Sequence, residues 1–154
     1  MAIFGWQSKD QYYDIASTFN FWVELDGIYV AGFSEVSGLE AETEFDEFRE
    51  GGVNGYKHKL PKGVQFSNLV LKRGMTRSPV LWLWYESCIK GKVRRMSGAI
   101  VLQDHDGNEI GRWSFYDAFP LKWSGPQLNA KTSDVAVESI EIAHSGLSGG
   151  FRKY

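Results

Sequence analysis

FNFWVELDGIYV, residues 19–30, decides the fold of this chain because it reads as a complete β-hairpin. Phe19, Phe21, Val23 and Leu25 point one way and the residues between them point the other, which is typical of a strand with one buried face. Asp26-Gly27 then supplies the positive φ angles that a two-residue turn requires. The sequence therefore predicts an antiparallel hairpin whose second strand covers residues 28–33.

The hairpin leads into residues 33–52, FSEVSGLEAETEFDEFREGG, which hold seven carboxylates and a single base, Arg49. Alternation places Glu42, Glu44 and Asp46 on one face of a predicted strand and Phe45 on the other. These carboxylates stand in a row along one strand, whereas a catalytic pair must face each other across a cleft. The spacing therefore favours a solvated or partner-facing acidic surface.

Charge is distributed unevenly along the chain, although the formal total is only −2. Residues 57–95 contain ten Lys or Arg residues and one acid, Glu86, so an acidic segment is followed by a basic one. The overall charge gives no general reason to expect nucleic acid or an anionic membrane as a partner. Two solvated faces and two complementary contact surfaces both remain open.

Further strands are predicted at residues 68–72, 99–103, 109–116 and 135–144, with Asp106-Gly107 turning the second into the third. In the last strand the apolar phase slips between Val137 and Ile140, which predicts a bulge or burial on both sides. A length of 154 residues suits one domain. The expected fold is mostly antiparallel β, a barrel or sandwich with one flanking helix.

That helix is predicted over VLWLWYESCI, with Ser78 as N-cap, Pro79 at the first helical position and Gly91 at its end. Its apolar side chains lie nearly all round the axis, which indicates burial on more than one side. One small sheet covers only one side, so we expect another copy of the chain to cover part of the helix. An ordinary surface position for Trp82 is the alternative.

No motif in the chain indicates catalysis, and we expect no enzyme activity, cofactor or metal. The three histidines lie far apart, and Asp104-His105-Asp106 precedes Gly107 in what reads as a turn, in preference to a weak cation site. Cys88, the single cysteine, reads as a buried structural thiol in a protein of a reducing compartment. The first residues lack the apolar core of a secretory signal and no later run has membrane-spanning length. We expect a protein that is made and assembled in the cytoplasm.

The order of several segments resembles the tail-tube proteins of contractile phages and phage-derived extracellular contractile injection systems. The family's aromatic strand, short turn, Ser-Gly-Leu segment and acidic strand ending in Gly-Gly are found, in this order, in FNFWVELDGIYVAGFSEVSGLEAETEFDEFREGG. The resemblance continues through KLPKGVQFSNLVLKRG, LWLWYES and GAIVLQDHDGNEIGRWSFYDAFPLKWSGPQLNAKTSDVAVESIEIAHSGL. The similarity covers roughly residues 13–147, which predicts an extension at 1–12, a tail-tube domain at 13–147 and a C-terminal tail at 148–154.

The resemblance implies a structural protein that forms hexameric rings, sheets joined edge to edge around a channel, stacked head to tail into a tube. Its implied partners are further copies of itself, a contractile sheath protein, baseplate and spike or hub proteins, and cargo or DNA in the lumen. No specific small molecule and no membrane insertion are implied. After assembly the chain is expected in a phage tail or injection particle.

Head-to-tail stacking requires two different, complementary surfaces, and we expect the acidic segment to meet basic residues of a neighbouring subunit or ring. The candidate contact residues are Glu42, Glu44, Asp46, Arg49, Glu50, Tyr56, Lys57, Lys59, Lys72, Arg73, Trp82, Arg94 and Arg95.

Three other functions remain open at this point. One is a tube-initiating ring that joins the main tube to the baseplate, which the unmatched chain ends suggest. Another is a ring protein of the type VI secretion kind, which shares the fold but usually lacks the Ser-Gly-Leu to Gly-Gly stretch. The third is a small β-barrel ligand-binding module.

Overall fold

The computed structural model describes residues 20–30, 32–49, 51–52 and 55–151, and places ten strands and one helix in them. In chain order these are β1 (Asn20–Leu25), β2 (Ile28–Val30), β3 (Phe33–Ser37), β4 (Ala41–Phe48), β5 (His58–Phe66), β6 (Leu69–Gly74), α1 (Val80–Ile89), β7 (Met96–Gln103), β8 (Glu109–Ser124), β9 (Val137–Ala143) and β10 (Gly146–Phe151).

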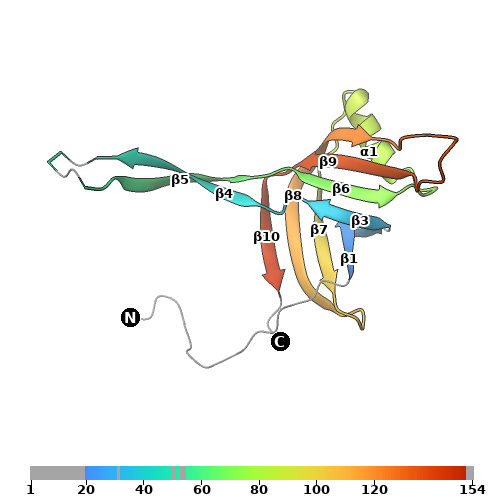
Figure 1. Cartoon of the computed structure of the whole chain (residues 1–154), viewed down its shortest axis with the longest axis horizontal. Coiled ribbons are helices and arrows are strands. Elements are labelled where there is room, and N and C mark those ends of the chain that lie inside the picture. The colour runs from blue at the N-terminus through green and yellow to red at the C-terminus, as the bar shows by residue number, and fades with distance from the viewer. Residues whose placement is uncertain (1–19, 31, 50, 53–54, 152–154) are drawn as a thin grey trace.

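The body of the molecule is an antiparallel sheet that changes direction within β8 (Figure 1). The hydrogen-bonded order is β2-β1-β7-β8-β9-β6-β3, and β10 also pairs with β8. The first part of β8 pairs with β7 and β10, whereas the part from Phe119 onward pairs with β9. Asp117, with φ of 51°, lies between these two parts, next to a break in the β7–β8 register. Such an irregularity bends a strand so that it can serve two packed sheets.

The core lies between these two halves of the sheet, with α1 closing part of it. Its fully buried members come from both halves, which ties them together by side-chain packing as well as by β8. They include Val23, Leu69, Leu71, Leu81, Ile100, Phe115, Ile140 and Ile142.

The predicted class, mostly antiparallel β with one flanking helix, is confirmed, but the sheet of the described residues does not close into a barrel. Its path ends at β2 on one side and β3 on the other. β2 has only three residues, and the pairing of β3 with β6 is interrupted between Phe33 and Glu35. Short edge strands and irregular pairing discourage unwanted pairing at the edges of a sheet.

The predicted opening hairpin is present. Asp26 and Gly27 have φ of 49° and 76°, and Leu25 stands opposite Ile28 in the β1–β2 pair. The second strand is shorter than predicted, because β2 ends at Val30 and Phe33 begins a separate strand, β3, that pairs with β6. Residues 19 and 31, which the prediction included, lie outside the described residues.

Helix α1 begins and ends close to the predicted bounds. Pro79, not Ser78, occupies the N-cap position, and no side chain caps the helix start. Gly91 ends it as predicted: with φ of 76° its N–H donates to the carbonyl of Cys88 at 3.0 Å. Leu81 and Trp84 are buried against the body.

Neither predicted cause of the slip in the last long strand, a bulge or burial on both sides, is present. Only one face of β9 is buried, and the register shift of the β8–β9 pair places its extra residue in β8, between Pro120 and Lys122. The β6–β9 register runs without a break, and Glu138, Ile140 and Ile142 all point inward. The apolar alternation is interrupted because the carboxylate of Glu138 takes an inward position, while the apolar Val137 beside it faces outward. Alternation itself continues.

Candidate functional site: assembly surfaces

Strands β4 and β5 form a hairpin that leaves the body and projects away from it (Figure 1); we call it the arm. In the described chain these two strands pair only with each other. Every residue of β4 is exposed, as are most residues of β5. A two-stranded ribbon with both faces in water is at best marginally stable. The arm therefore needs a partner surface to hold its shape.

Register assigns the side chains of the arm to two faces, because directly opposed residues share a face. Glu42, Glu44, Asp46 and Phe48 lie on one face, together with their opposed residues, which include Gln65, Leu60 and His58. We call this the acidic face. Opposed pairs such as Thr43–Val64 and Phe45–Pro61 form the other face, so Glu42, Glu44 and Asp46 share one face and Phe45 lies on the other, as predicted.

Part of the acidic row is paired within the arm. Asp46 forms an ion pair with Lys62 at 3.0 Å, and Gln65 donates a hydrogen bond to Glu44. Glu47, on the other face, bonds Lys57 at 2.9 Å, and this hydrogen bond holds the pKa of Glu47 below its ordinary value. Since these pairs are exposed, water and salt screen them strongly. They leave the acidic side chains available to a second partner.

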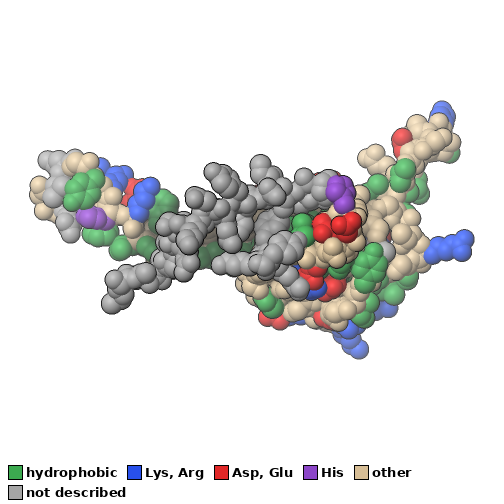
Figure 2. All heavy atoms as spheres, turned by 90° about the horizontal axis from the view of Figure 1, so that it is seen from below, with side chains coloured by type: hydrophobic (Ala, Val, Ile, Leu, Met, Phe, Trp, Pro, Cys, Tyr) green, Lys and Arg blue, Asp and Glu red, His purple; other side chains and the backbone are tan. Residues whose placement is uncertain are grey.

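Large apolar side chains are also exposed on the arm, next to charged ones (Figure 2). Phe48 and Leu60, on the acidic face, are 40% and 54% exposed. Phe45, 48% exposed on the opposite face, lies 4.8 Å from the ammonium of Lys59. Exposed apolar and acidic groups on one ribbon are typical of a contact surface.

The arm joins the body through a small set of bonds at its root. The backbone N–H of Ser67 donates to the carbonyl of Glu40 at 3.3 Å, and its hydroxyl donates to the Glu40 carboxylate at 3.1 Å. His144, at the end of β9, contacts the Ser67 carbonyl at 3.0 Å. The sequence did not reveal that this hairpin stands apart from the sheet, because alternation is the same in a free ribbon and in a sheet.

The second exposed surface lies at α1, in the upper part of the body in Figure 1, whereas the arm projects to the left, away from the helix. A groove of about 360 Å³ runs beside the helix, lined mainly by Val80, Leu83, Trp84, Met96 and Arg94. We call it the helix groove. Leu83 is 53% exposed, so the predicted surplus of apolar surface on the helix is present.

Five exposed basic residues lie close to α1 in the sequence, and Arg94 among them lines the groove; we call the five the basic rim. They lie in the segments immediately before and after α1: Arg77, Lys90, Lys92, Arg94 and Arg95. Trp84 holds the second segment against the helix by donating its indole N–H to the carbonyl of Arg94 at 2.8 Å. Lys90 pairs with Glu86 and Arg94 with Asp26, each at 3.5 Å between exposed groups. Arg95 lies 4.9 Å from the ring of Phe119.

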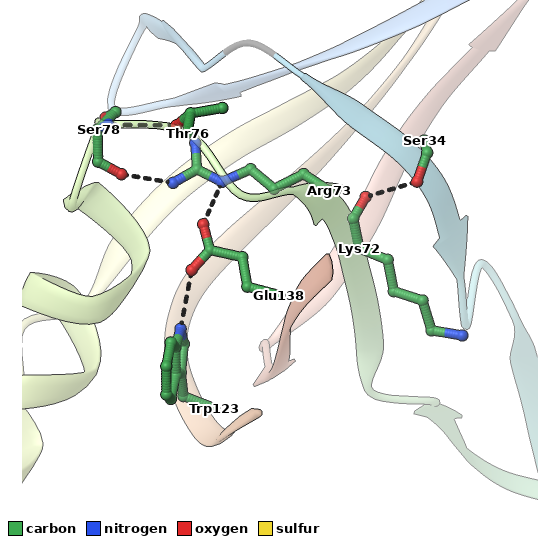
Figure 3. Close-up of polar contacts among 7 residues, drawn as sticks. All are labelled: Ser34, Lys72, Arg73, Thr76, Ser78, Trp123 and Glu138. Atoms are coloured by element: carbon green, nitrogen blue, oxygen red, sulfur yellow. Dashed lines mark hydrogen bonds and ion pairs between the residues drawn. The ribbon is translucent and has the colours of Figure 1, made fainter. Parts of the chain in front are cut away.

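Not all predicted contact residues lie on these surfaces. Arg73 is a correction: it is 1% exposed and bonds Glu138 inside the body, so it is not free to meet a neighbouring subunit. Lys72 is accessible but pairs with Glu35 at 3.4 Å on the outer side of β6 (Figure 3 draws its side chain). Trp82, 37% exposed, packs edge to face on Trp123. Arg49 and Tyr56 are exposed near the tip of the arm, and Glu50 lies outside the described residues.

A polar cluster that the sequence analysis missed lies on the face of the β1–β7–β8 sheet that points away from the core. Arg112 bonds Glu24 through two nitrogens, at 2.7 and 3.3 Å, and Glu109 at 2.7 Å. The indole of Trp22 also donates to Glu24, at 3.2 Å. The hydrogen bond from Arg112 lowers the pKa of Glu24, and both carboxylates raise the pKa of Arg112. The alternation of residues 19–25 predicts that Glu24 faces away from the core. It gives no sign of Arg112, which lies 88 residues further along the chain.

Among the described residues no group of three or more His, Cys, Asp or Glu side chains is placed to hold a metal ion. The turn at Asp104–Gly107 is confirmed: the Asp104 carboxylate accepts the backbone N–H groups of Asp106 and Asn108 at 3.0 and 2.8 Å. Those bonds lower the pKa of Asp104. Cys88 is partly buried, 3.9 Å from the carbonyl of Pro120.

The sequence matches the family model of the T4-like virus tail tube protein gp19 over residues 17–148. The chain belongs to this tail-tube family. The resemblance noted from its segments is confirmed. The described tail-tube fold extends slightly beyond the match, since β10 continues to Phe151.

Solved structures share this tail-tube fold. A chain of the sheath–tube complex of the extracellular contractile injection system PVC is 24% identical, with a TM-score of 0.80, covering 90% of this chain and 93% of that one. The tube-terminating cap of the anti-feeding prophage AFP is 22% identical, with a TM-score of 0.81, covering 97% and 100%. Hcp1 from Flavobacterium johnsoniae is 16% identical, with a TM-score of 0.58, covering 88% and 98%. Curated proteins gave no match.

A tail-tube protein of this family is a structural component. In the part of the chain that the structure describes, no helix is both long and apolar enough to cross a membrane.

Proposed function

We propose that this chain is the structural subunit of the inner tube of a contractile injection system or contractile phage tail. Six copies form a ring, and rings stack head to tail around a lumen that carries cargo or DNA. The observation that carries this proposal is the arm: a ribbon exposed on both faces that has no strand partner in the described body. The ring of six is what the resemblance to tail-tube proteins implies.

The surfaces of the subunit suit head-to-tail assembly. The arm and α1 differ in charge and shape, and the arm projects away from the part of the body that carries α1 (Figure 1). A contact between two different surfaces, repeated from copy to copy, generates rings or filaments. The open sheet edges at β2 and β3 also gain partners when neighbouring copies close a ring.

The binding energy that holds the subunits together arises from many weak contacts repeated in every subunit. An exposed ion pair contributes only about 0–1 kcal/mol. Within a ring each such pair occurs in every subunit, and multivalent contact raises the overall affinity well above that of one pair. The contact residues we assign to the subunit and ring interfaces are Glu42, Glu44, Asp46, Arg49, Glu50, Tyr56, Lys57, Lys59, Lys72, Trp82, Arg94 and Arg95.

The partners in this function are a contractile sheath protein around the tube and baseplate and spike or hub proteins at its end. The subunit is made and assembled in the cytoplasm and then forms part of the particle. It carries out no catalysis, needs no cofactor or small molecule and does not itself insert into a membrane.

A tube-initiating ring at the baseplate is the second candidate. Strand β10 favours this second candidate. The family match ends at residue 148, but β10 continues beyond it and pairs with β8 as far as Phe151, which stands opposite Gly111. An added edge strand is a means of giving one ring a contact that the others lack.

Negative-stain electron microscopy of the purified full chain over a concentration series tests both candidates. Stacked tubes without added proteins support the main-tube function. Rings with a central hole that never stack support the initiating ring. A monomer at every concentration, confirmed by sedimentation velocity, overturns both and favours a binding module.

A further inference from the structure

One broad face of the body carries no part of the arm or of the helix groove: the outward face of β3, β6, β9 and the second part of β8. The registered pairs assign its side chains, because directly opposed residues share a face. On β6 the side chain of Arg73 points into the core and that of Lys72 points outward; Figure 3 shows them leaving the strand on different sides. We call this surface the wall face. Its central members are Glu35, Val70, Lys72, Lys122, Ser139 and Glu141.

The charges of the wall face balance within two rows that cross the strands. Glu35, Lys72 and Ser139 form one row, and Val70, Glu141 and Lys122 form the next. Lys72 pairs with Glu35 at 3.4 Å, and Lys122 stands directly opposite Glu141. Opposite charges at such positions of a sheet attract each other. Each row has one acid and one base, so these six residues carry no net charge.

Other charged surfaces of the described chain are unbalanced. The acidic face of the arm has an excess of carboxylates, and the basic rim has an excess of cations. On the outward face of the other half of the sheet, Arg112 lies between two carboxylates, Glu24 and Glu109. The wall face therefore differs from each of these surfaces in its charge.

The wall face also lacks a large apolar centre. Its exposed apolar residues, Val137 and Leu121, lie at its margins, the first at the start of β9 and the second in the register shift of β8. Val70, in the middle, is partly buried. Because the centre of a stable protein–protein interface is mostly apolar, this face is poorly suited to a permanent contact. It is suited to a surface along which a partner moves.

The arm indicates where the wall face lies in a ring. Three residues join β3 to β4 and two join β5 to β6, so the β3–β6 pair continues directly into the arm (Figure 1). This half of the sheet therefore extends towards the next copy. Leu81 of α1 and Ile100 of the other half pack on its core side. A closed ring has less room inside than outside, so the bulk of each subunit lies outside and the wall face lies inside.

We propose that the wall face lines the lumen and that it fits a polypeptide cargo and not nucleic acid. Proteins hold nucleic acid with Lys and Arg side chains that replace the counterions of its phosphates. Both lysines of the wall face already have a carboxylate beside them, so a polyanion gains little here. A polypeptide that carries charges of both signs finds groups of either sign.

This inference rests on the proposed function and deepens it by naming the lumen surface and the class of cargo. Glu35 and Lys72 lie next to the edge strand β3, so they also border the neighbouring copy.

Accessibility of a single thiol tests the position of the wall face. In a Cys88→Ser background, which removes the only native cysteine, Ser139→Cys places a thiol in the middle of this face. Ser148→Cys, in β10 on the other half of the sheet, is the matched control. In assembled tubes a bulky polymer-linked maleimide should modify Ser139→Cys at least about tenfold more slowly than Ser148→Cys, whereas a small maleimide should modify both. Equal rates with the bulky reagent overturn the assignment.

Protection from digestion tests the class of cargo. The full chain is assembled with a fluorescent peptide of mixed charge or with a short single-stranded oligonucleotide. Wild-type tubes should protect the peptide from protease and leave the oligonucleotide open to nuclease. Glu35→Gln with Glu141→Gln frees both lysines and should raise the protected oligonucleotide at least about tenfold at low salt, a gain that high salt removes. Glu24→Gln with Glu109→Gln, the same change of charge on the other half of the sheet, should give no gain.

Three results overturn the polypeptide cargo: wild-type tubes that protect the oligonucleotide, wild-type tubes that leave the peptide unprotected, and an equal gain in the two double variants. Microscopy of the same samples separates this inference from the proposed function. Tubes in which the bulky reagent modifies Ser139→Cys freely overturn the inference alone. Samples without rings or tubes overturn the proposed function and, with it, this inference.

Discussion

Arg73 on β6 and Glu138 on β9 stand opposite each other in the sheet and form an ion pair of 2.5 Å in the interior of the body (Figure 3). Their side chains are 1% and 4% exposed. The second Glu138 oxygen accepts the indole N–H of Trp123 at 3.1 Å, and Arg73 donates to the carbonyl of Ser78 at 2.9 Å. Every charged oxygen thus has a donor, and the pair links two strands to the segment that begins α1.

Removing one member of this pair should be costly. Glu138→Ala leaves the Arg73 guanidinium buried without its counter-ion, which typically destabilises a protein by about 3–5 kcal/mol. Urea unfolding followed by tryptophan fluorescence measures the change. Replacing both residues, Arg73→Met with Glu138→Leu, should recover most of the loss because no buried charge remains.

The exposed pair Lys72–Glu35 provides the comparison, since its groups are 43% and 56% exposed. Glu35→Ala should change stability by only about 0–1 kcal/mol. If Glu138→Ala were no more harmful than Glu35→Ala, the buried pair would not be the contact that holds β6 to β9.

A glycine on β10 controls how closely this strand approaches β8. A Cβ on Gly149, whose φ is 116°, would lie 2.0 Å from the carbonyl oxygen of Arg112, whereas a Cβ on Gly150, with φ of 136°, would meet nothing within 4 Å. Gly149→Ala should therefore loosen β10 at a cost of about 1–3 kcal/mol. The rate of hydrogen exchange of the β10 amides should rise more in Gly149→Ala than in Gly150→Ala. Equal rises in both variants would mean that backbone strain alone, and not the clash with Arg112, loosens β10.

The acidic face of the arm should matter for assembly and not for folding. Glu44 and Asp46 have partners only within the exposed arm, so Glu44→Lys with Asp46→Lys should leave the unfolding midpoint of the body within about 1 kcal/mol of wild type. Sedimentation at low salt should show loss of large assemblies. Variants that polymerise like the parent would contradict the role given to these carboxylates.

The Glu24–Arg112 bond predicts a pH dependence of stability. Because the hydrogen bond from Arg112 lowers the pKa of Glu24 in the folded state, folding gains stability above the ordinary value of 4.5 and loses it as the pH falls below 4.5 through the folded pKa. Glu24→Gln should flatten the decline in unfolding free energy over that acid range. Glu42→Gln, on the exposed arm, is the matched control and should keep the wild-type profile; an identical profile in both variants would rule out this linkage.

Local patterns predicted much of the fold. The Asp26-Gly27 turn, the alternation of β1 and the Gly91 helix end are each determined by neighbours in the sequence, because they depend on φ preferences and on a period of two. The placement of Glu42, Glu44 and Asp46 on one face of β4 and of Phe45 on the other follows from the same period. These features needed no knowledge of distant partners.

What could not be predicted depends on long-range pairing. Glu138 reads as an outward residue until Arg73, 65 residues away, is placed beside it. Alternation along β4 also gives no sign that the ribbon leaves the body, since a period of two is the same in a free ribbon and in a larger sheet. The predicted barrel failed for a related reason: closure depends on how β2 and β3 meet, which no local pattern determines.

One feature of the body bears on mechanical load. β8 runs for 16 residues through both halves of the sheet, with β7 and β10 along its first part and β9 along its second. A force applied to one half therefore reaches the other along a single covalent backbone, not only across side-chain packing. The halves cannot slide apart unless β8 itself is stripped from its neighbours, so the subunit resists shear as one unit.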